Sequence, residues 1–190
     1  MNKFILLPHI FISLLFFSCT DKVYLKKIDN YLNASTSEIK SKYMADNYHS
    51  YFMEKKGDWE DKIAALKSFQ NWDAPLNPDI KISSYIKDDS IWTVRFNEQN
   101  DFTKPIGYPG WKGTMQITFD SNGLIQETIY IPDSSNLSYK SFLKPAVEWL
   151  QKNMPADLNI VYQNNKLIQT EATANKWKML LHIWKEQNKK

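Results

Sequence analysis

Residues 111–131 alternate between apolar and polar side chains on either side of a short turn. Met115, Ile117 and Phe119 fall on one face of a strand, because successive strand side chains point to opposite faces. Asp120-Ser-Asn-Gly123 forms the turn, since Asn-Gly adopts positive φ at low cost. The return strand is expected to place three isoleucines on one face, Ile125, Ile129 and Ile131. Both faces are partly apolar, which predicts a hairpin in a sheet covered on both sides.

The first eighteen residues have the pattern of a targeting segment. Lys3 precedes a mostly apolar stretch from Phe4 to Phe17. This stretch is shorter than the roughly 20 residues that a transmembrane helix needs, and it fits a signal peptide. Cys19 is the only cysteine and follows Ser18 directly, which resembles a bacterial lipobox. We therefore expect a lipoprotein signal peptide over 1–18 and lipidation of Cys19. The alternative is an ordinary signal peptide followed by a free or buried cysteine.

A lipid on Cys19 predicts a membrane-anchored protein of the cell envelope, with its mature domain in the periplasm or at the cell surface. Loss of Lys3 with the signal peptide leaves 23 of the 24 basic residues against 21 acidic ones. So small a net charge, with the lysines scattered, lacks the basic patch that nucleic-acid binding requires. We expect no nucleic-acid partner.

Helical and strand patterns divide the rest of the chain into three regions. Helices are expected over residues 21–32, 35–44, 58–72, 142–150, 155–161 and 173–184, the helix at 58 being capped by Asp58. Strands are expected over 80–86 and 92–96, with a loop over 97–113 before the hairpin. Helices followed by antiparallel strands predict an α+β fold. The expected domains are 19–133, an α+β domain, and 134–190, a C-terminal helical extension.

Several short motifs in this order resemble the NTF2-like superfamily, and within it the SnoaL-like proteins. They are Tyr43-Met-Ala-Asp-Asn-Tyr48, Gly57-x-Trp-Glu-Asp-x-Ile63, Pro78-Asp79 and Asp120-x-x-Gly-x-Ile125. The resemblance covers residues 22–132 and implies a cone, in which a curved antiparallel sheet wraps around the N-terminal helices. A pocket would open at its wide end. The C-terminal helices have no counterpart in that family.

The resemblance also implies catalytic candidates. An acidic residue at the end of the last long strand is the general acid or base in polyketide-cyclase members, and Asp133 is the nearest match. Asp46 and His49 resemble a family Asp-x-x-x-His motif with one residue fewer between them. A carboxylate beside His49 would suit acid–base work. The alternatives are that Asp133 is a turn residue and that His49 belongs to a hydrogen-bonded polar cluster.

Aromatic surfaces with a few polar groups are typical of small-molecule sites. The predicted ligand-binding residues are Tyr48, Trp92, Arg95, Trp111 and Tyr130. The alternative for the two tryptophans is the core, where such residues are found more often. Arg95 is either a pocket residue that needs a partner such as Glu127 or a ligand carboxylate, or an exposed or cross-strand paired residue. The sequence has no metal-binding or phosphate-loop motif, so we expect no metal and no cofactor.

Two functions are open. The first is a lipid-anchored module that binds a small apolar ligand or a protein partner without catalysis. The second is a cofactor-independent SnoaL-like isomerase, cyclase or hydratase with an aromatic-lined pocket. The apolar stripe of the C-terminal helices must be buried, on the sheet face or across the pocket mouth. NTF2-like domains dimerise through that sheet face, so helices there would leave a monomer, which we expect.

Overall fold

A computed structural model describes residues 19–54 and 59–188, so the predicted signal peptide lies outside the described residues. Two helices come first in the chain, α1 (Cys19–Leu32) and α2 (Ser37–Ser41), and a third, α3 (Lys62–Ser68), follows the first two strands. A π-helical turn, η1 (Phe69–Asp73), and a 3₁₀ turn, η2 (Ala74–Leu76), extend α3. No helix within the described ranges has the length and apolar character needed to cross a membrane.

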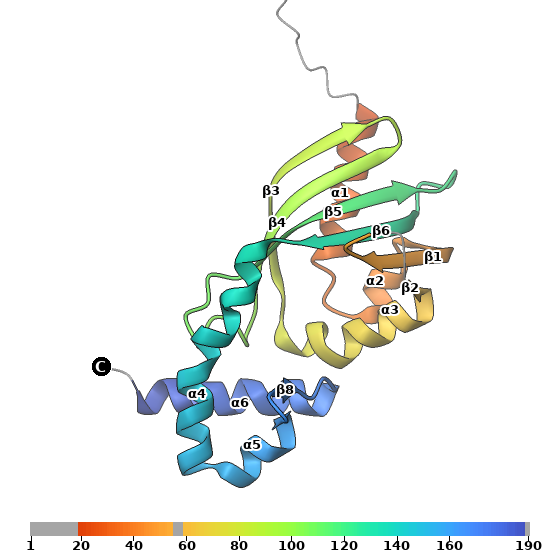
Figure 1. The fold of residues 1–190 in the computed structure, drawn as a ribbon. Coiled ribbons are helices and arrows are strands. Elements are labelled where there is room, and N and C mark those ends of the chain that lie inside the picture. The colour runs from red at the N-terminus through yellow and green to blue at the C-terminus, as the bar shows by residue number, and fades with distance from the viewer. Residues whose placement is uncertain (1–18, 55–58, 189–190) are drawn as a thin grey trace, which may run out of the picture.

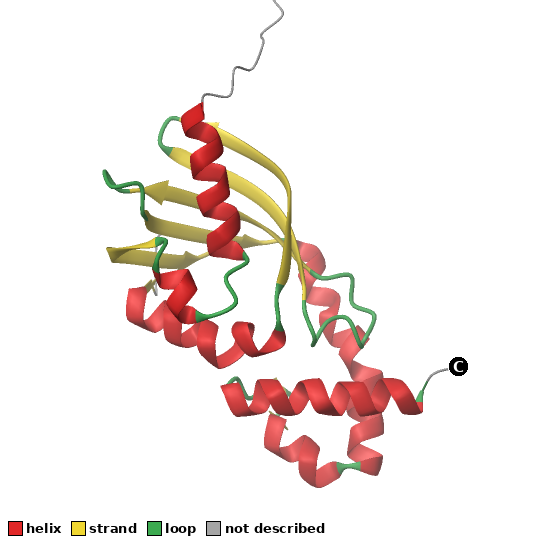
Figure 2. Ribbon diagram, turned by 180° about the vertical axis from the view of Figure 1, so that it is seen from behind, coloured by secondary structure: helices red, strands yellow, loops and turns green. Residues whose placement is uncertain are grey.

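Six strands form one curved sheet in the order β2-β1-β6-β5-β4-β3. Their bounds are β1 Met44–Phe52, β2 Trp59–Asp61, β3 Asp79–Asp88, β4 Ile91–Gln99, β5 Trp111–Phe119 and β6 Ile125–Pro132. Every pair is antiparallel except β1 and β6, which run parallel. The sheet bends around α1, α2 and α3, which lie on its concave side (Figures 1 and 2). The predicted α+β fold of N-terminal helices on a curved sheet is confirmed, with one parallel pair in place of a wholly antiparallel sheet.

The concave side holds one of two hydrophobic cores. Trp92 and Val94 of β4 are buried and alternate with the more exposed Thr93 and Arg95. They pack with Ile117 of the hairpin and with Ile28 and Leu32 of α1. The period-2 pattern of the strands and the helical spacing of α1 therefore meet in a single core.

Two helix boundaries differ from the sequence prediction. The helix predicted over 35–44 ends at Ser41. Residues 44–52 form β1, which was not predicted, because their backbone pairs with β6, a partner that the local pattern does not reveal. The helix predicted to begin at Asp58 begins at Lys62, where Asp61 Oδ1 accepts the Ala64 N–H at 2.8 Å. The residues from Trp59 to Asp61 pair with β1 instead.

The hairpin is where the sequence predicted it, but its isoleucines do not share one face. The register shifts between Thr118 and Phe119, which pair with Glu127 and Ile125. The extra residue reverses the alternation along β6. Ile125 consequently joins the concave core, whereas Ile129 and Ile131 alternate with the inward-facing Thr128 and Tyr130.

The C-terminal extension forms the second core at one end of the sheet (Figure 1). It contains α4 (Tyr139–Asn153), preceded by a 3₁₀ turn η3 (Ser134–Ser138), then α5 (Pro155–Val161) and α6 (Glu171–Gln187). A two-stranded ribbon, β7 (Tyr162–Gln163) and β8 (Lys166–Leu167), precedes α6. These helices pack on one another, on Leu76 and on Phe102, Ile106 and Tyr108 of the loop after β4.

Helices α4, α5 and α6 therefore do not cover the convex face of the sheet, contrary to one of the two placements expected from sequence (Figures 1 and 2). Their apolar side chains are buried in the second core instead, so none of these three helices covers the convex face. The expected monomer rested on covering that face, and it stays a prediction.

Trp177 of α6 is fully buried at the centre of the second core, where its Nε1 donates to the Val161 carbonyl at 3.3 Å. Replacing a buried tryptophan by alanine removes its transfer free energy and leaves a cavity. We expect Trp177→Ala to lower the free energy of unfolding by about 3–5 kcal/mol in chemical denaturation. Trp59→Ala is the matched control, because that side chain is 52% exposed and its loss should cost far less. Equal losses in the two variants would contradict this description of the core.

Candidate functional site

Three charged side chains from three separate elements converge on the concave side of the sheet. Lys40 comes from α2, Asp73 from η1 and Glu98 from the end of β4. The charges of Asp73 and Glu98 both act on Lys40, and those of Asp73 and Lys40 both act on Glu98. The charges of Lys40 and Glu60 in turn act on Asp73. Each side chain is surrounded by protein yet keeps partial solvent exposure. The three groups therefore form one charged cluster that keeps contact with water.

Lys40 is held by α1 and η1. Its Nζ donates to the Tyr31 carbonyl oxygen at 3.0 Å and lies 4.0 Å from the centre of the Tyr31 ring. The same Nζ atom lies 4.5 Å from the centre of the Phe69 ring of η1. Burial lowers the pKa of Lys40 to about 8, against the opposing attraction of Asp73 and Glu98. This amine is accordingly still mostly protonated at neutral pH, but it loses its proton at a lower pH than a surface lysine does.

Burial raises the pKa values of the two carboxyl groups, whereas it lowers that of Lys40. Burial raises the pKa of Glu98 to about 7, and the nearby Asp73 raises it further, although Asn100 Nδ2 donates to Glu98 Oε1 at 2.9 Å. Burial also raises the pKa of Asp73 to about 6, with Lys40 opposing. Glu98 therefore exchanges its proton near neutral pH, and a general acid or base is most efficient when its pKa lies near the operating pH.

Tyr48 joins the sheet to α1 through a chain of hydroxyl groups. Its hydroxyl lies 2.9 Å from that of Tyr31 and 2.6 Å from that of Thr128 on β6. All three side chains are buried, and burial raises the pKa values of both tyrosines. The chain supplies neutral hydroxyl groups beside the charged cluster.

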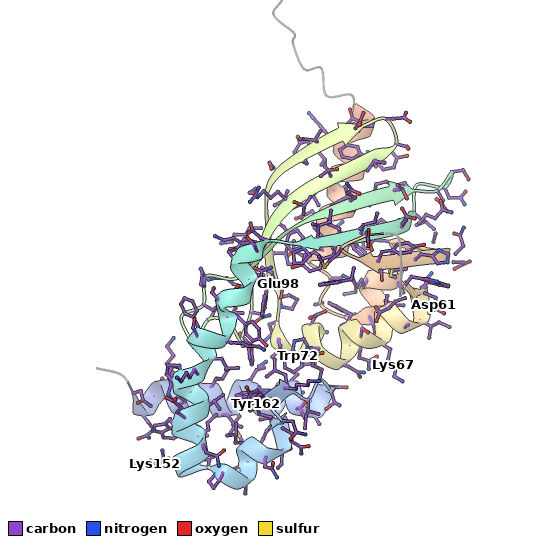
Figure 3. The ribbon with its side chains drawn as sticks, viewed as in Figure 1. Asp61, Lys67, Trp72, Glu98, Lys152 and Tyr162 are labelled. Carbon is purple, nitrogen blue, oxygen red and sulfur yellow. The ribbon has the colours of Figure 1, made fainter. Side chains whose placement is uncertain are left out.

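Aromatic rings surround the charged cluster. Tyr130 of β6 stacks on Phe96, with ring centres 5.8 Å apart, and burial followed by the charge of Glu98 raises its pKa to about 12. Figure 3 places Glu98 at the lower end of the sheet, above Trp72 of η1. The combination of rings with a few titratable groups is typical of a small-molecule site.

The residues predicted to be catalytic lie elsewhere. His49 pairs in register with Asp61 and Glu127, and its ring stacks on the half-exposed Trp59 at 4.4 Å. Asp133 caps η3 by accepting the Ser135 N–H at 3.2 Å, and its Oδ2 accepts from Arg95 at 3.1 Å. The Ser135 N–H is the main cause that lowers the pKa of Asp133. The structure does not bring His49 and Asp133 together, and their catalytic roles stay predictions.

The residues predicted to bind ligand are divided among three places. Tyr48 and Tyr130 face the concave side beside the charged cluster. Trp92 is also on that side but is buried in the first core between Tyr24 and Tyr85. Trp111 stacks on Tyr108 and Tyr139 in the second core. Arg95 is 62% exposed at its ion pair with Asp133.

Sequence reasoning missed Lys40, Asp73 and Glu98, although two of them follow visible patterns. Glu98 continues the inward positions 92, 94 and 96 of β4, so strand alternation predicts an inward carboxylate. Asp73 lies four residues after Phe69, on the apolar stripe of its helix. Lys40 follows no such pattern, because its partners come from α1 and η1. Within the described ranges, no three His, Cys, Asp or Glu side chains lie close enough to hold a metal ion.

No protein-family model matches the sequence, and no curated protein matches it either. The fold is similar to several solved structures. An NTF2-like protein of unknown function from Cytophaga hutchinsonii has 8% identity and a TM-score of 0.45, over 60% of this chain and 93% of its own. The epoxide hydrolase/cyclase-like enzyme SalBIII of salinomycin pyran-ring formation has 12% identity and a TM-score of 0.49, over 60% and 94%.

A third similar structure is the Δ5-3-ketosteroid isomerase from Mycobacterium sp., with 14% identity and a TM-score of 0.45. The match covers 56% of this chain and 90% of the isomerase. At such identities these likenesses concern the fold alone.

The raised pKa values of Asp73 and Glu98 predict a pH dependence of stability. Both groups hold protons in the folded chain that the unfolded chain releases between about pH 4 and pH 7. Stability should therefore fall as the pH rises from 5 to 7.5, by at most about 1.4 kcal/mol per pH unit for each proton. Denaturation of the Glu98→Gln variant should give a shallower slope. The exposed Glu54→Gln control should keep the wild-type slope, and equal slopes in all three proteins would refute the assignment.

Proposed function

We propose that the concave side of the sheet binds a small, largely apolar molecule whose polar group faces Glu98 and Asp73, and that Glu98 exchanges a proton with it. The observation that carries this proposal is the convergence of Lys40, Asp73 and Glu98 in one charged cluster. Clustered titratable groups with shifted pKa values are more frequent at functional sites than elsewhere. The aromatic rings around them suit an apolar ligand.

The proposed chemistry is general acid–base catalysis without a cofactor. Glu98 is the proton-exchanging group because its pKa, about 7, lies nearest neutrality. Ionised, it takes a proton from a carbon next to a carbonyl group; protonated, it returns one. The Lys40 cation stabilises the negative charge that develops during proton transfer. It already favours the ionised forms of both carboxyl groups, because it lowers their pKa values. This corresponds to the isomerase, cyclase or hydratase alternative.

Binding without catalysis is the second candidate. It is favoured by the internal partners of the polar groups, because Lys40 binds the Tyr31 carbonyl and the hydroxyl groups of Tyr31, Tyr48 and Thr128 contact one another. Groups already satisfied by the protein gain less from a reacting ligand. A single probe separates the two candidates.

That probe is 2-tetralone, an apolar ketone with exchangeable protons beside its carbonyl group. We expect the protein to accelerate deuterium incorporation from D₂O above pH 7, where Glu98 is ionised, as followed by proton NMR. Glu98→Gln should slow the catalysed exchange by at least about 100-fold, the lower range for a lost general base. Glu54→Gln should exchange at the wild-type rate. Saturable binding without exchange would establish the second candidate, and neither binding nor exchange would reject the site.

Membrane attachment is a separate part of the proposal. We propose that the chain is lipidated on Cys19 and held at the cell envelope, with the mature domain in the periplasm or at the cell surface. The support is the sequence alone, in which an apolar segment of signal-peptide length is followed by Ser18 and then by the single cysteine.

Detergent phase partitioning tests the anchor. Expressed in a bacterium, the wild-type chain should enter the detergent phase and gain the mass of the lipid, because acyl chains bind bilayers far more strongly than this domain surface. Cys19→Ser should lose the added mass. Added mass retained by the variant, or absent from the wild type, would contradict lipidation at Cys19.

A further inference from the structure

A pocket of about 310 Å³ lies at the junction of α6 with the loop that follows β4, and none of its lining residues belongs to the charged cluster on the concave side. Its lining residues are Asp101, Lys104, Pro105, Lys178, His182 and Lys185. Three of these come from α6 at spacings of four and three residues, which places them on one face of the helix. The loop residues face them across the pocket.

The ion pairs of the pocket leave it with excess positive charge. Asp101 Oδ2 accepts from Lys178 Nζ at 3.1 Å and from Asn77 Nδ2 at 2.6 Å, so its charge is already balanced. Lys178 is also fixed by the Pro75 carbonyl oxygen at 2.9 Å. No carboxylate oxygen of the described residues lies within 4.0 Å of the amino group of Lys104 or Lys185. Two exposed lysines, with His182 between them, are thus available to a ligand.

We propose that this pocket binds a small phosphate monoester. Two lysines without carboxylate partners match the two negative charges of such an ester, and Lys178 and His182 supply further donors to its oxygens. The volume accommodates the phosphate with a small organic group, for which Pro105 provides an apolar contact. The dipole of α6 opposes an anion near Lys185, which lies in the last turn of the helix, but salt screens that effect.

A phosphate monoester exists both as a free solute and as a lipid headgroup. Helix α6, which bears three of the lining residues, lies at the end of the molecule opposite to the start of α1, where Cys19 begins the described chain (Figure 1). A chain anchored there would hold the pocket away from its own membrane. Granted the proposed anchor, we assign the site to a free ester.

The test is titration of the full chain, held in phosphatidylcholine nanodiscs, with phenyl phosphate by isothermal calorimetry. We expect saturable binding that the Lys104→Gln/Lys185→Gln double variant weakens at least tenfold. Lys140→Gln/Lys152→Gln is the matched control, because it removes the same charge from exposed positions of α4 outside the pocket. The control should bind within twofold of the wild type.

Two further arms decide the chemistry and its source. Benzenesulfonate, with a single negative charge, should bind at least tenfold more weakly than phenyl phosphate. Equal binding of the two, or equal weakening by both double variants, would overturn the site as a non-selective basic surface. Phosphatidic acid in the nanodiscs should leave the affinity for phenyl phosphate unchanged. Competition that raises the apparent Kd tenfold, and that is absent from the double variant, would assign the site to a headgroup and overturn the free ester.

Discussion

The parallel pairing of β1 with β6 is the contact on which the concave side depends. It sets Tyr48 opposite β6, where the Tyr48 hydroxyl lies 2.6 Å from that of Thr128 and 2.9 Å from that of Tyr31. Because Tyr31 belongs to α1, this chain of hydroxyl groups fixes the first helix against the middle of the sheet. The same helix then holds Lys40 through its Tyr31 carbonyl and ring. The pairing of these distant strands thereby positions the charged cluster, which local sequence patterns do not predict.

Desolvation is the main cause of the pKa shifts in the charged cluster. For Lys40, Asp73 and Glu98 alike, burial is the largest cause of the pKa shift. The attraction between Lys40 and the carboxylates reduces these shifts, whereas repulsion from Asp73 adds to that of Glu98. A core built for stability alone would replace such a group of charges with apolar side chains at little or no cost. Their retention near neutral pKa values, with Asp73 on a π-helical turn of the kind frequent at functional sites, is what the proposed proton exchange explains.

Sequence patterns predicted most of the elements whose partners are local. The β5–β6 hairpin and α6 were recognised because strand alternation, an Asn-Gly turn and helical spacing all act within a few residues. Residues 44–52 were not, since their strand is defined by a partner about 80 residues away. Among predicted site residues, Tyr48 and Tyr130 lie beside the charged cluster, whereas His49 and Asp133 do not. Alternation along β4 would have indicated Glu98, but Lys40 depends on contacts from two distant elements and carries no local signal.

The turns η1 and η2 connect the charged cluster to the C-terminal extension. Asp73 of η1 faces the concave cluster, while the neighbouring Trp72 packs on the second core with its ring centre 5.8 Å from that of Phe102. Two residues further along, the Pro75 carbonyl oxygen accepts from Lys178 of α6. A single short segment thus bears a carboxyl group of one site and a hydrogen bond to a lysine of the other. The extension is therefore more than an appended helical unit, because its packing fixes the turn that positions Asp73.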